Sequence, residues 1–342
     1  MLFAVFSIGT AFAPNLAAFF VFRLLTALFG TAFLIFLSGT LIGPCFAPLL
    51  GGVIVTYAPW RGIFWMQAGL GGLATILAIV CLPETIHSRT IDDMRSLSPS
   101  ERAKHILHML NPVNVTVLLL SNHNLWMVGL ASSALMFNMY SLLTPIRYVL
   151  NARFNLTTPL QSGFLFLAPG LGYIIGTCFG GRVSDAVVKQ YIEKRGRRIP
   201  EDRLRAATIF LGIVSPACML IYGWTVENEV GGIALPVIVM FIQGISQLLG
   251  FPSLNVYCVD VAQGKGQNAM IVAGNYQIRY AFAAAGSVAC LPSIEALGVG
   301  WFSTISVIFM FFTMLLVKLV IRYGEIWRRS RSQLDDSEPP LA

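Results

Sequence analysis

Long runs of apolar residues, separated by short polar connectors, extend along most of the sequence. A helix of about 20 apolar residues crosses a bilayer core about 30 Å thick, and most of the runs have about that length. They lack the alternation of apolar and polar residues that is typical of a membrane β-barrel. Since lipid leaves only helices and closed barrels, the pattern predicts an all-α, polytopic membrane protein. Ten candidate spans follow: Leu2–Ala13, Leu16–Phe36, Gly39–Val55, Ile63–Leu82, Leu125–Val149, Ser162–Gly181, Ala206–Trp224, Gly232–Leu254, Ala269–Leu291 and Trp301–Ile321.

Composition agrees with a membrane protein. The 342 residues are 56% hydrophobic and 11% charged, with a mean hydropathy of +0.72. Soluble domains carry about 25% charged residues. The net charge of +7 would indicate a nucleic-acid partner only on a folded soluble face, so no nucleic acid is expected.

Lysine and arginine gather in alternate connectors. They are frequent in residues 83–114, 182–205 and 322–331. The charged residues of the connector 225–231 are all acidic. Cytoplasmic connectors hold the positive excess, so the basic ones are predicted to be cytoplasmic. The expected organisation is an incomplete N-terminal helical bundle (1–82), a cytoplasmic linker (83–120), a C-terminal six-helix bundle (121–324) and a disordered cytoplasmic tail (325–342).

Few residues suggest catalysis or metal binding. The six cysteines are scattered singly through apolar segments, which favours packing over disulfides or metal ligation. His105 and His108 share a helical face, but no third ligand accompanies them. No Ser/His, paired-carboxylate or metal constellation lies in a span. The sequence therefore predicts no enzyme, no cofactor and no metal.

Small residues recur every fourth position in one apolar run, at Gly39, Gly43, Ala47 and Gly51. They form a stripe that another backbone could approach closely. Two prolines with the same spacing, and a second glycine at the end of the run, stand beside it: Pro44, Pro48 and Gly52. Each proline removes a helical hydrogen bond and bends the helix. A hinge is the hypothesis, and a merely close-packed helix is the alternative.

The segment SGTLIGPCFAPLLGG resembles the fifth-helix antiporter motif of the major facilitator superfamily, in the version of fungal drug:proton antiporters. FRLLTALFG resembles the fourth-helix motif, and WRGIFWMQAGLGG with LPET resembles the sixth helix and its exit. GGRVSDAVVKQYIEKRGRRIPEDRL and NVYCVDVAQGKGQNAMIVAGNYQIR are similar to the loop between helices eight and nine and to the entry of helix eleven. Quinidine and dityrosine exporters are the subgroup most similar to this sequence.

The resemblance implies two six-helix halves, with about 10 of the 12 helices in this chain. Helices one and two are expected to be missing, as is the polar connector between helices four and five. The 40 residues from Leu16 to Val55 would span about 60 Å as one helix, twice a bilayer. Two crossings with a break near Ser38 are therefore expected, and a deletion in the sequence is suspected.

Charged residues near or inside the spans are candidates for proton coupling. Arg23 occupies the arginine position of the fourth-helix motif, with an arginine that snorkels to water as the alternative. Asp185 is expected to pair with Arg182 in a charge latch, as the family loop implies. The full set is Arg23, Arg182, Asp185, Asp260 and Arg279.

The resemblance also implies a substrate cavity lined by helices one, four, seven and ten. When these helix positions are transferred to this sequence, they give a cavity wall of polar and aromatic residues without charged side chains. Such a wall suits amphipathic organic molecules. Ordinary packing and interhelical hydrogen bonding are the alternative for each residue. The wall comprises Thr26, Ser133, Phe137, Tyr140, Thr144, Gln243 and Gln247. A second small-residue stripe, Ala168, Gly172, Gly176 and Gly180, is expected to face the stripe that begins at Gly39.

Together these features predict a secondary transporter that exports small organic compounds in exchange for protons. The alternative is a truncated, transport-inactive membrane protein. The expected partners are a small-molecule substrate, protons and the lipid bilayer of the plasma membrane or of an internal membrane such as that of the vacuole.

Overall fold

A computed structural model describes residues 47–59, 61–81, 112–262 and 268–337. The chain divides into an N-terminal unit, Met1–His108, and a C-terminal unit, Met109–Ala342. In the N-terminal unit the helix Ala47–Tyr57 is followed by α3 (Arg61–Cys81), which corresponds to the predicted span Ile63–Leu82.

Part of the predicted hinge lies in the first of these helices. Ala47, Pro48, Gly51 and Gly52 belong to the helix Ala47–Tyr57, and the carbonyl of Gly52 accepts a hydrogen bond from the hydroxyl of Thr56 at 2.7 Å. Gly39, Gly43 and Pro44 lie outside the described residues, as do the spans Leu2–Ala13 and Leu16–Phe36 and the expected break near Ser38. The hinge stays a prediction.

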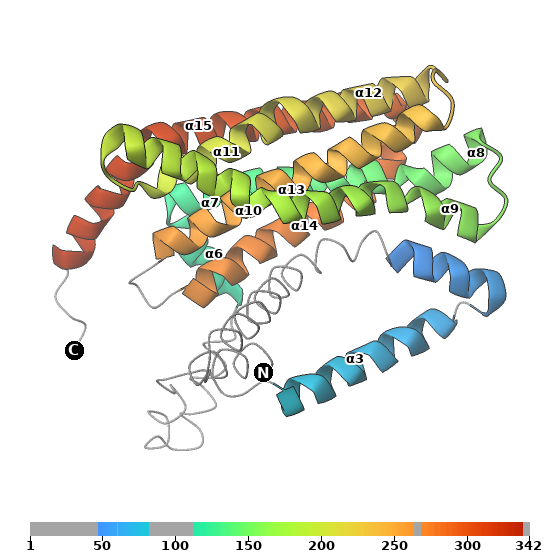
Figure 1. Cartoon of the computed structure of the whole chain (residues 1–342), viewed down its shortest axis with the longest axis horizontal. Coiled ribbons are helices and arrows are strands. Elements are labelled where there is room, and N and C mark those ends of the chain that lie inside the picture. Colours follow the sequence, from blue (N-terminus) through green and yellow to red (C-terminus); the bar gives the residue numbers. More distant parts are fainter. Residues whose placement is uncertain (1–46, 60, 82–111, 263–267, 338–342) are drawn as a thin grey trace, which may run out of the picture. The chain divides into compact units, whose positions relative to one another are not determined.

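The C-terminal unit is built from helices, and its described residues contain no strand (Figure 1). Its elements are α6 (Pro112–Leu120), α7 (His123–Leu143), η2 (Ile146–Leu150), α8 (Asn151–Arg153), α9 (Pro159–Leu165), α10 (Leu167–Arg195), η3 (Pro200–Arg203), α11 (Leu204–Ile209), η4 (Phe210–Val214), α12 (Ser215–Glu227), α13 (Ala234–Ala262), α14 (Asn268–Leu297) and α15 (Val299–Ser337).

Six helical stretches in the described residues are long and apolar enough to cross a bilayer. Each contains or largely overlaps a predicted span, and each reaches further into the polar connectors. They are His123–Arg153, Pro159–Arg195, Pro200–Glu227, Ala234–Val261, Met270–Leu297 and Val299–Arg328. The prediction of an all-α polytopic membrane fold is confirmed.

Two expected boundaries differ from the structure. Helix α15 continues through Ser337, so the prediction that the tail is disordered from residue 325 is wrong. Its extension is tied to the bundle, because Arg328 forms an ion pair with Glu201 and Glu325 forms one with Arg197. Helix α6 lies within the predicted linker 83–120 but packs on α7 and α14, since its apolar side chains need cover.

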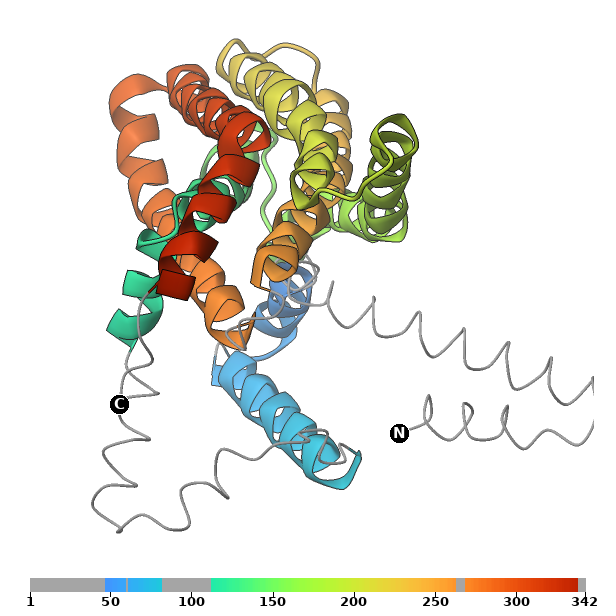
Figure 2. The same cartoon turned by 90° about the vertical axis from the view of Figure 1, so that its left-hand side faces the viewer.

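Neighbouring helices of the C-terminal unit pack in a definite pattern. α10 lies along α13, α7 lies between α14 and α15, and α12 lies along α15 (Figures 1 and 2). The side chains buried between them include large apolar and aromatic residues such as Leu135, Phe251 and Tyr257. The interior of the unit is thus centred on α7 and α13.

The small-residue stripe of α10 faces α13. A β-carbon at Gly176 would lie 2.6 Å from the β-carbon of Leu248 and 2.8 Å from the carbonyl oxygen of Ile245. Gly172 and Gly180 meet the backbone of α13 in the same way. The prediction that these three glycines face the stripe beginning at Gly39 is wrong, because α13 occupies their surface.

Proline changes the helical geometry just beyond the C-terminal end of α7. Pro145 has no amide hydrogen, so the carbonyl of Ser141 loses its usual helical partner. The thiol of Cys290 lies 3.7 Å from this carbonyl oxygen, and the chain continues as the π-helical segment η2. Proline and single-turn π-helical segments are both recognised causes of a bend in a helix.

Candidate functional site

Two hydroxyl groups of the predicted wall, those of Ser133 and Thr144, donate to carbonyls one helical turn before them. Ser133 is buried, and its hydroxyl donates to the carbonyl of Gly129 at 2.7 Å. The hydroxyl of Thr144 donates to the carbonyl of Tyr140, also at 2.7 Å. Both hydroxyls keep lone pairs that can accept a hydrogen bond from another group.

Phe137 belongs to an aromatic cluster that joins α7 to α14 and α15. Its ring meets Phe309 edge-on, with 5.7 Å between ring centroids, and Phe309 stacks on Phe282 of α14 at 5.5 Å. Such pairs contribute about 0.5–1.5 kcal/mol beyond burial. Thr26, predicted for the same wall, lies outside the described residues.

The two glutamines of α13 both point toward α7. The amide nitrogen of Gln243 donates to the side-chain oxygen of Asn138, and that of Gln247 donates to the carbonyl of Leu135 at 2.6 Å. Asn138 in turn donates to the hydroxyl of Ser306 on α15 at 3.2 Å. We call Asn138, Gln243, Gln247 and Ser306 the amide cluster. All four side chains are buried.

The amide cluster has spare hydrogen-bonding capacity. The side-chain oxygens of Gln243 and Gln247 have no hydrogen-bond partner among the described residues. An unpaired buried polar group costs about 1–3 kcal/mol. Asn138 was missed at the sequence level because it lies one position beyond the face drawn through Phe137. An asparagine inside an apolar span was the signal that could have found it.

A second polar cluster surrounds Arg279 of α14. Its guanidinium donates to the side-chain oxygen of Asn255 on α13 and stacks over the rings of Phe251 and Tyr276, 4.8 and 4.7 Å from their centroids. Asn275 extends this cluster by donating to Asn255 at 3.5 Å. Arg279 is completely buried.

The expected charge latch has a different partner. Asp185 contacts Arg203 at 2.9 Å rather than Arg182, which is exposed on α10. Arg203 also lies 3.4 Å from Asp260 of α13, and Arg198 lies 3.5 Å from the same carboxylate. The pairing with Arg182 is wrong because the connector after α10 folds back and brings Arg203 beside Asp185.

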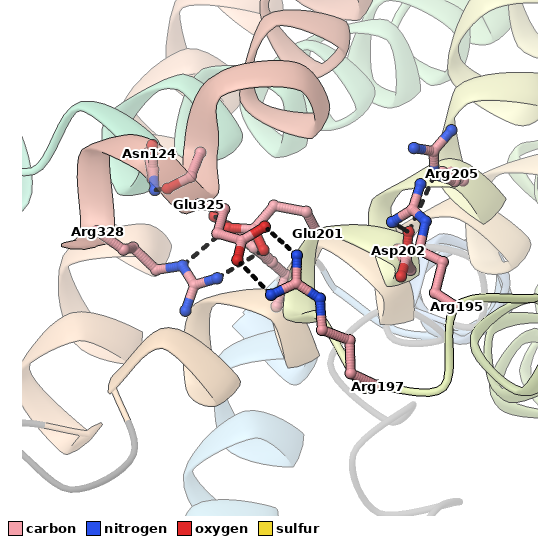
Figure 3. Close-up of polar contacts among 10 residues, drawn as sticks. Asn124, Arg195, Arg197, Glu201, Asp202, Arg205, Glu325 and Arg328 are labelled. Carbon is pink, nitrogen blue, oxygen red and sulfur yellow. Dashed lines mark hydrogen bonds and ion pairs between the residues drawn. The ribbon is translucent and has the colours of Figure 1, made fainter. Parts of the chain in front are cut away.

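Two buried carboxylates complete this end of the unit (Figure 3). Glu201 accepts two hydrogen bonds from Arg328, at 2.8 and 2.7 Å, and one from the hydroxyl of Tyr257 at 3.3 Å. Asp202 pairs with Arg195 at 3.0 Å and with Arg205 at 3.2 Å. The acidic pair inside the basic segment RGRRIPEDRL was the signal for them.

The described residues contain no group of three or more metal-ligating side chains. The amide cluster and the cluster around Arg279 supply amides, a hydroxyl and a guanidinium, which can bind and orient a polar molecule. Each ion pair among the described residues includes a residue of the segment 195–205.

Comparison with known proteins identifies the family to which this chain belongs. The family model described as Major Facilitator Superfamily matches residues 1–287, well over half of the chain. The chain belongs to the major facilitator superfamily. The resemblance inferred from the motifs is thereby confirmed, and the protein is an integral, multi-pass membrane protein.

Relatives of this superfamily member are fungal transport proteins. It is 24% identical to the efflux pump radE of Floropilus chiversii, over 95% of this chain and 66% of the relative. It is 24% identical to the MFS-type transporter phiD of a fungal species, strain ATCC 74256, over 96% of this chain and 54% of the relative. It is 27% identical to quinidine resistance protein 3 of Saccharomyces cerevisiae, over 50% of this chain and 24% of the relative.

This superfamily member thus spans between about half and two thirds of the length of radE and phiD. These relatives are named as transporters or as an efflux pump, and the quinidine resistance protein agrees with the subgroup that the motifs resemble.

Proposed function

We propose that this chain acts in secondary active transport of small organic compounds, by alternating access. Membership of the superfamily and the names of the relatives support transport. Export, rather than uptake, is supported by the efflux pump among those relatives. The plasma membrane or an internal membrane such as that of the vacuole is the proposed location.

The observation that carries the proposal is the amide cluster. Gln247 lies near the middle of the span Ala234–Val261, and Asn138 lies near the middle of His123–Arg153. Polar groups at that depth are expensive, and intramembrane polar residues line substrate pathways in transporters. The unpaired oxygens of Gln243 and Gln247 would accept hydrogen bonds from a hydroxyl, amide or amine of the substrate.

The neighbouring aromatic residues fit the same class of substrate. Phe137 is only partly buried, so its ring offers an apolar surface on α7, the helix that carries Asn138 of the amide cluster. An amphipathic organic molecule would pair its polar groups with amides and its apolar surface with aromatic rings.

Proton coupling is part of the proposal and is supported by the resemblance to drug:proton antiporters. Arg23 lies outside the described residues. Asp185 of α10 and Asp260 of α13 both form ion pairs with Arg203. They are candidates for groups that change partner during the transport cycle.

The test is transport by the full chain in proteoliposomes with an imposed pH gradient. Amphipathic fluorescent dyes that are cationic, neutral and anionic serve as probes. Gln247→Leu is expected to lower the rate of dye movement about 10-fold or more, since it removes a buried hydrogen bond of about 1–3 kcal/mol. Gln190→Leu, at an exposed site on α10, is the matched control and should transport normally.

Thermal unfolding and size-exclusion chromatography of each variant check that it is folded. If no dye moves faster than in protein-free vesicles, the transport-inactive alternative holds. If transport occurs without a pH gradient and does not respond to one, the coupling to protons is refuted.

A further inference from the structure

Arg279 carries a positive charge inside the membrane-spanning part of the bundle. It lies about one helical turn from the midpoint of the span Met270–Leu297 and has no solvent-exposed surface. Among the described residues no acidic side chain forms an ion pair with it, and its Nε has no hydrogen-bond partner. Its charge therefore lacks a counter-ion in this part of the chain.

The acidic side chains of the C-terminal unit that form ion pairs pair with other arginines. These are Asp185, Glu201, Asp202, Asp260 and Glu325. Glu227 instead accepts the backbone amides of Val299 and Gly300. Glu295, also on α14, is about 24 Å further along the helix from Arg279.

The first part of the sequence contributes no acid either. Residues 1–83 contain no aspartate and no glutamate, and the first acidic residue of the chain is Glu84. The spans read from that part of the sequence therefore hold no carboxylate that could neutralise the guanidinium.

The neighbours of Arg279 compensate its charge only in part. The rings of Phe251 and Tyr276 attract the guanidinium through their faces, and Asn255 is a neutral acceptor. Burial of one charge carries a desolvation penalty that such neutral neighbours do not offset. An oxyanion is the strongest complement, since a guanidinium binds a carboxylate or sulfonate through two parallel hydrogen bonds.

We propose that Arg279 binds the negatively charged group, a carboxylate or sulfonate, of an organic compound. The Nε–H that has no partner and a terminal N–H of the guanidinium form the two-pronged donor. Asn255 and Tyr276 are partly exposed, so they stand on the side from which the anion reaches the guanidinium. Entry requires these side chains to shift, because Arg279 itself is fully covered.

This inference rests on the proposed function for one point only, that the bound compound is transported. It narrows the substrate class to amphipathic compounds with an anionic group. The amide cluster would then hold the uncharged polar groups of such a compound.

The test measures thermal unfolding of the full chain in detergent with three probes that share one naphthalene ring: 2-naphthoate, 2-naphthalenesulfonate and the neutral 2-naphthamide. Both anions are expected to raise the melting temperature by about 2–4 °C near saturation. The amide should produce no rise. Equal rises with the amide would overturn the proposal.

Arg279→Met should remove the response to the anions, whereas Arg322→Met, at an exposed arginine of α15, should keep it. Arg279→Lys keeps the charge but loses the two-pronged geometry, and should need about 10-fold more naphthoate for half of the shift. This variant decides the matter if Arg279→Met does not fold. An unchanged response of either Arg279 variant would overturn the proposal.

Lipid headgroups are a second source of oxyanions. The same titration is therefore made in phosphatidylcholine and in phosphatidylglycerol. If phosphatidylglycerol raises the melting temperature of the unmodified chain but not of Arg279→Met, and abolishes the response to naphthoate, the occupant is a lipid and the proposal for an organic anion fails.

The two proposals fail separately. Transport of neutral dye with no response to anions would retain the proposed function and refute the anion site. Binding of naphthoate through Arg279 without movement of any dye would retain the anion site and refute the proposed function.

Discussion

Gly176 shows how strongly a single residue can constrain this bundle. A β-carbon at this position would meet both a side chain and a backbone carbonyl of α13, and backbone atoms cannot move aside as the end of a flexible side chain can. The close approach depends on the absence of a side chain at this position.

We expect Gly176→Ala to lower the free energy of unfolding by about 1–3 kcal/mol, because it overpacks the contact between α10 and α13. Gly181→Ala is the control on the same helix, since a β-carbon there would have no atom within 4 Å. Thermal or denaturant unfolding of the purified chain measures both. If both substitutions change the free energy of unfolding equally, helix propensity and not packing against α13 determines the effect of Gly176→Ala.

Single residues also show the limit of the sequence interpretation. Gln243 and Gln247, which the sequence selected for the cavity wall, are both buried against α7, and their role in binding a substrate stays a prediction. Asn138, which meets Gln243, was missed. The partner of Asp185 was also wrong, because the position of Arg203 depends on how a connector folds back and no local pattern encodes that.

At the level of elements, the ends of several helices are held together by charge. Glu201 of η3 binds Arg328 of α15 and Tyr257 of α13, and Asn124 of α7 donates to the carbonyl of Gly324 at 3.0 Å (Figure 3). Four helical segments therefore meet around one buried carboxylate and its neighbours.

Glu201→Ala should lower the free energy of unfolding by about 3–5 kcal/mol, since it leaves the charge of Arg328 without its buried partner. Arg197→Ala, which breaks the more exposed pair with Glu325, should cost about 0–1 kcal/mol. Denaturant unfolding compares the two. A small loss for Glu201→Ala would mean that Arg328 finds solvent when its partner is removed.

The elements themselves were largely predictable. Six apolar runs gave six helical spans, because length and hydrophobicity decide which segments enter lipid. The extension of α15 to Ser337 was not predictable from composition, since it depends in part on ion pairs with a connector far away in sequence. The face of α10 that carries its glycines was recognised, but not the helix that covers it.

For the whole molecule, the distribution of cations predicts that the connector 182–205 is cytoplasmic and the connector 225–231 is on the opposite side. Each contains a turn at a helix end of the C-terminal unit, with Gly196 and Glu229 at positive φ. Chemical labelling of these turns can therefore test the orientation of the chain in the membrane.

A membrane-impermeant maleimide applied to intact cells should label Asn228→Cys. It should label Arg197→Cys only after the cells are permeabilised. The unmodified chain, with its native cysteines, gives the background. Labelling of Arg197→Cys from outside would reverse the orientation and with it the assignment of the basic connectors.

The contact between α10 and α13 has one more consequence. Their backbones touch at Gly172, Gly176 and Gly180, so no layer of deformable side chains separates them there. If α13 tilts, α10 must tilt with it, because the two helices are packed backbone to backbone. Any rearrangement that exposes the α13 glutamines to the other side of the membrane therefore moves this pair of helices as a single rod.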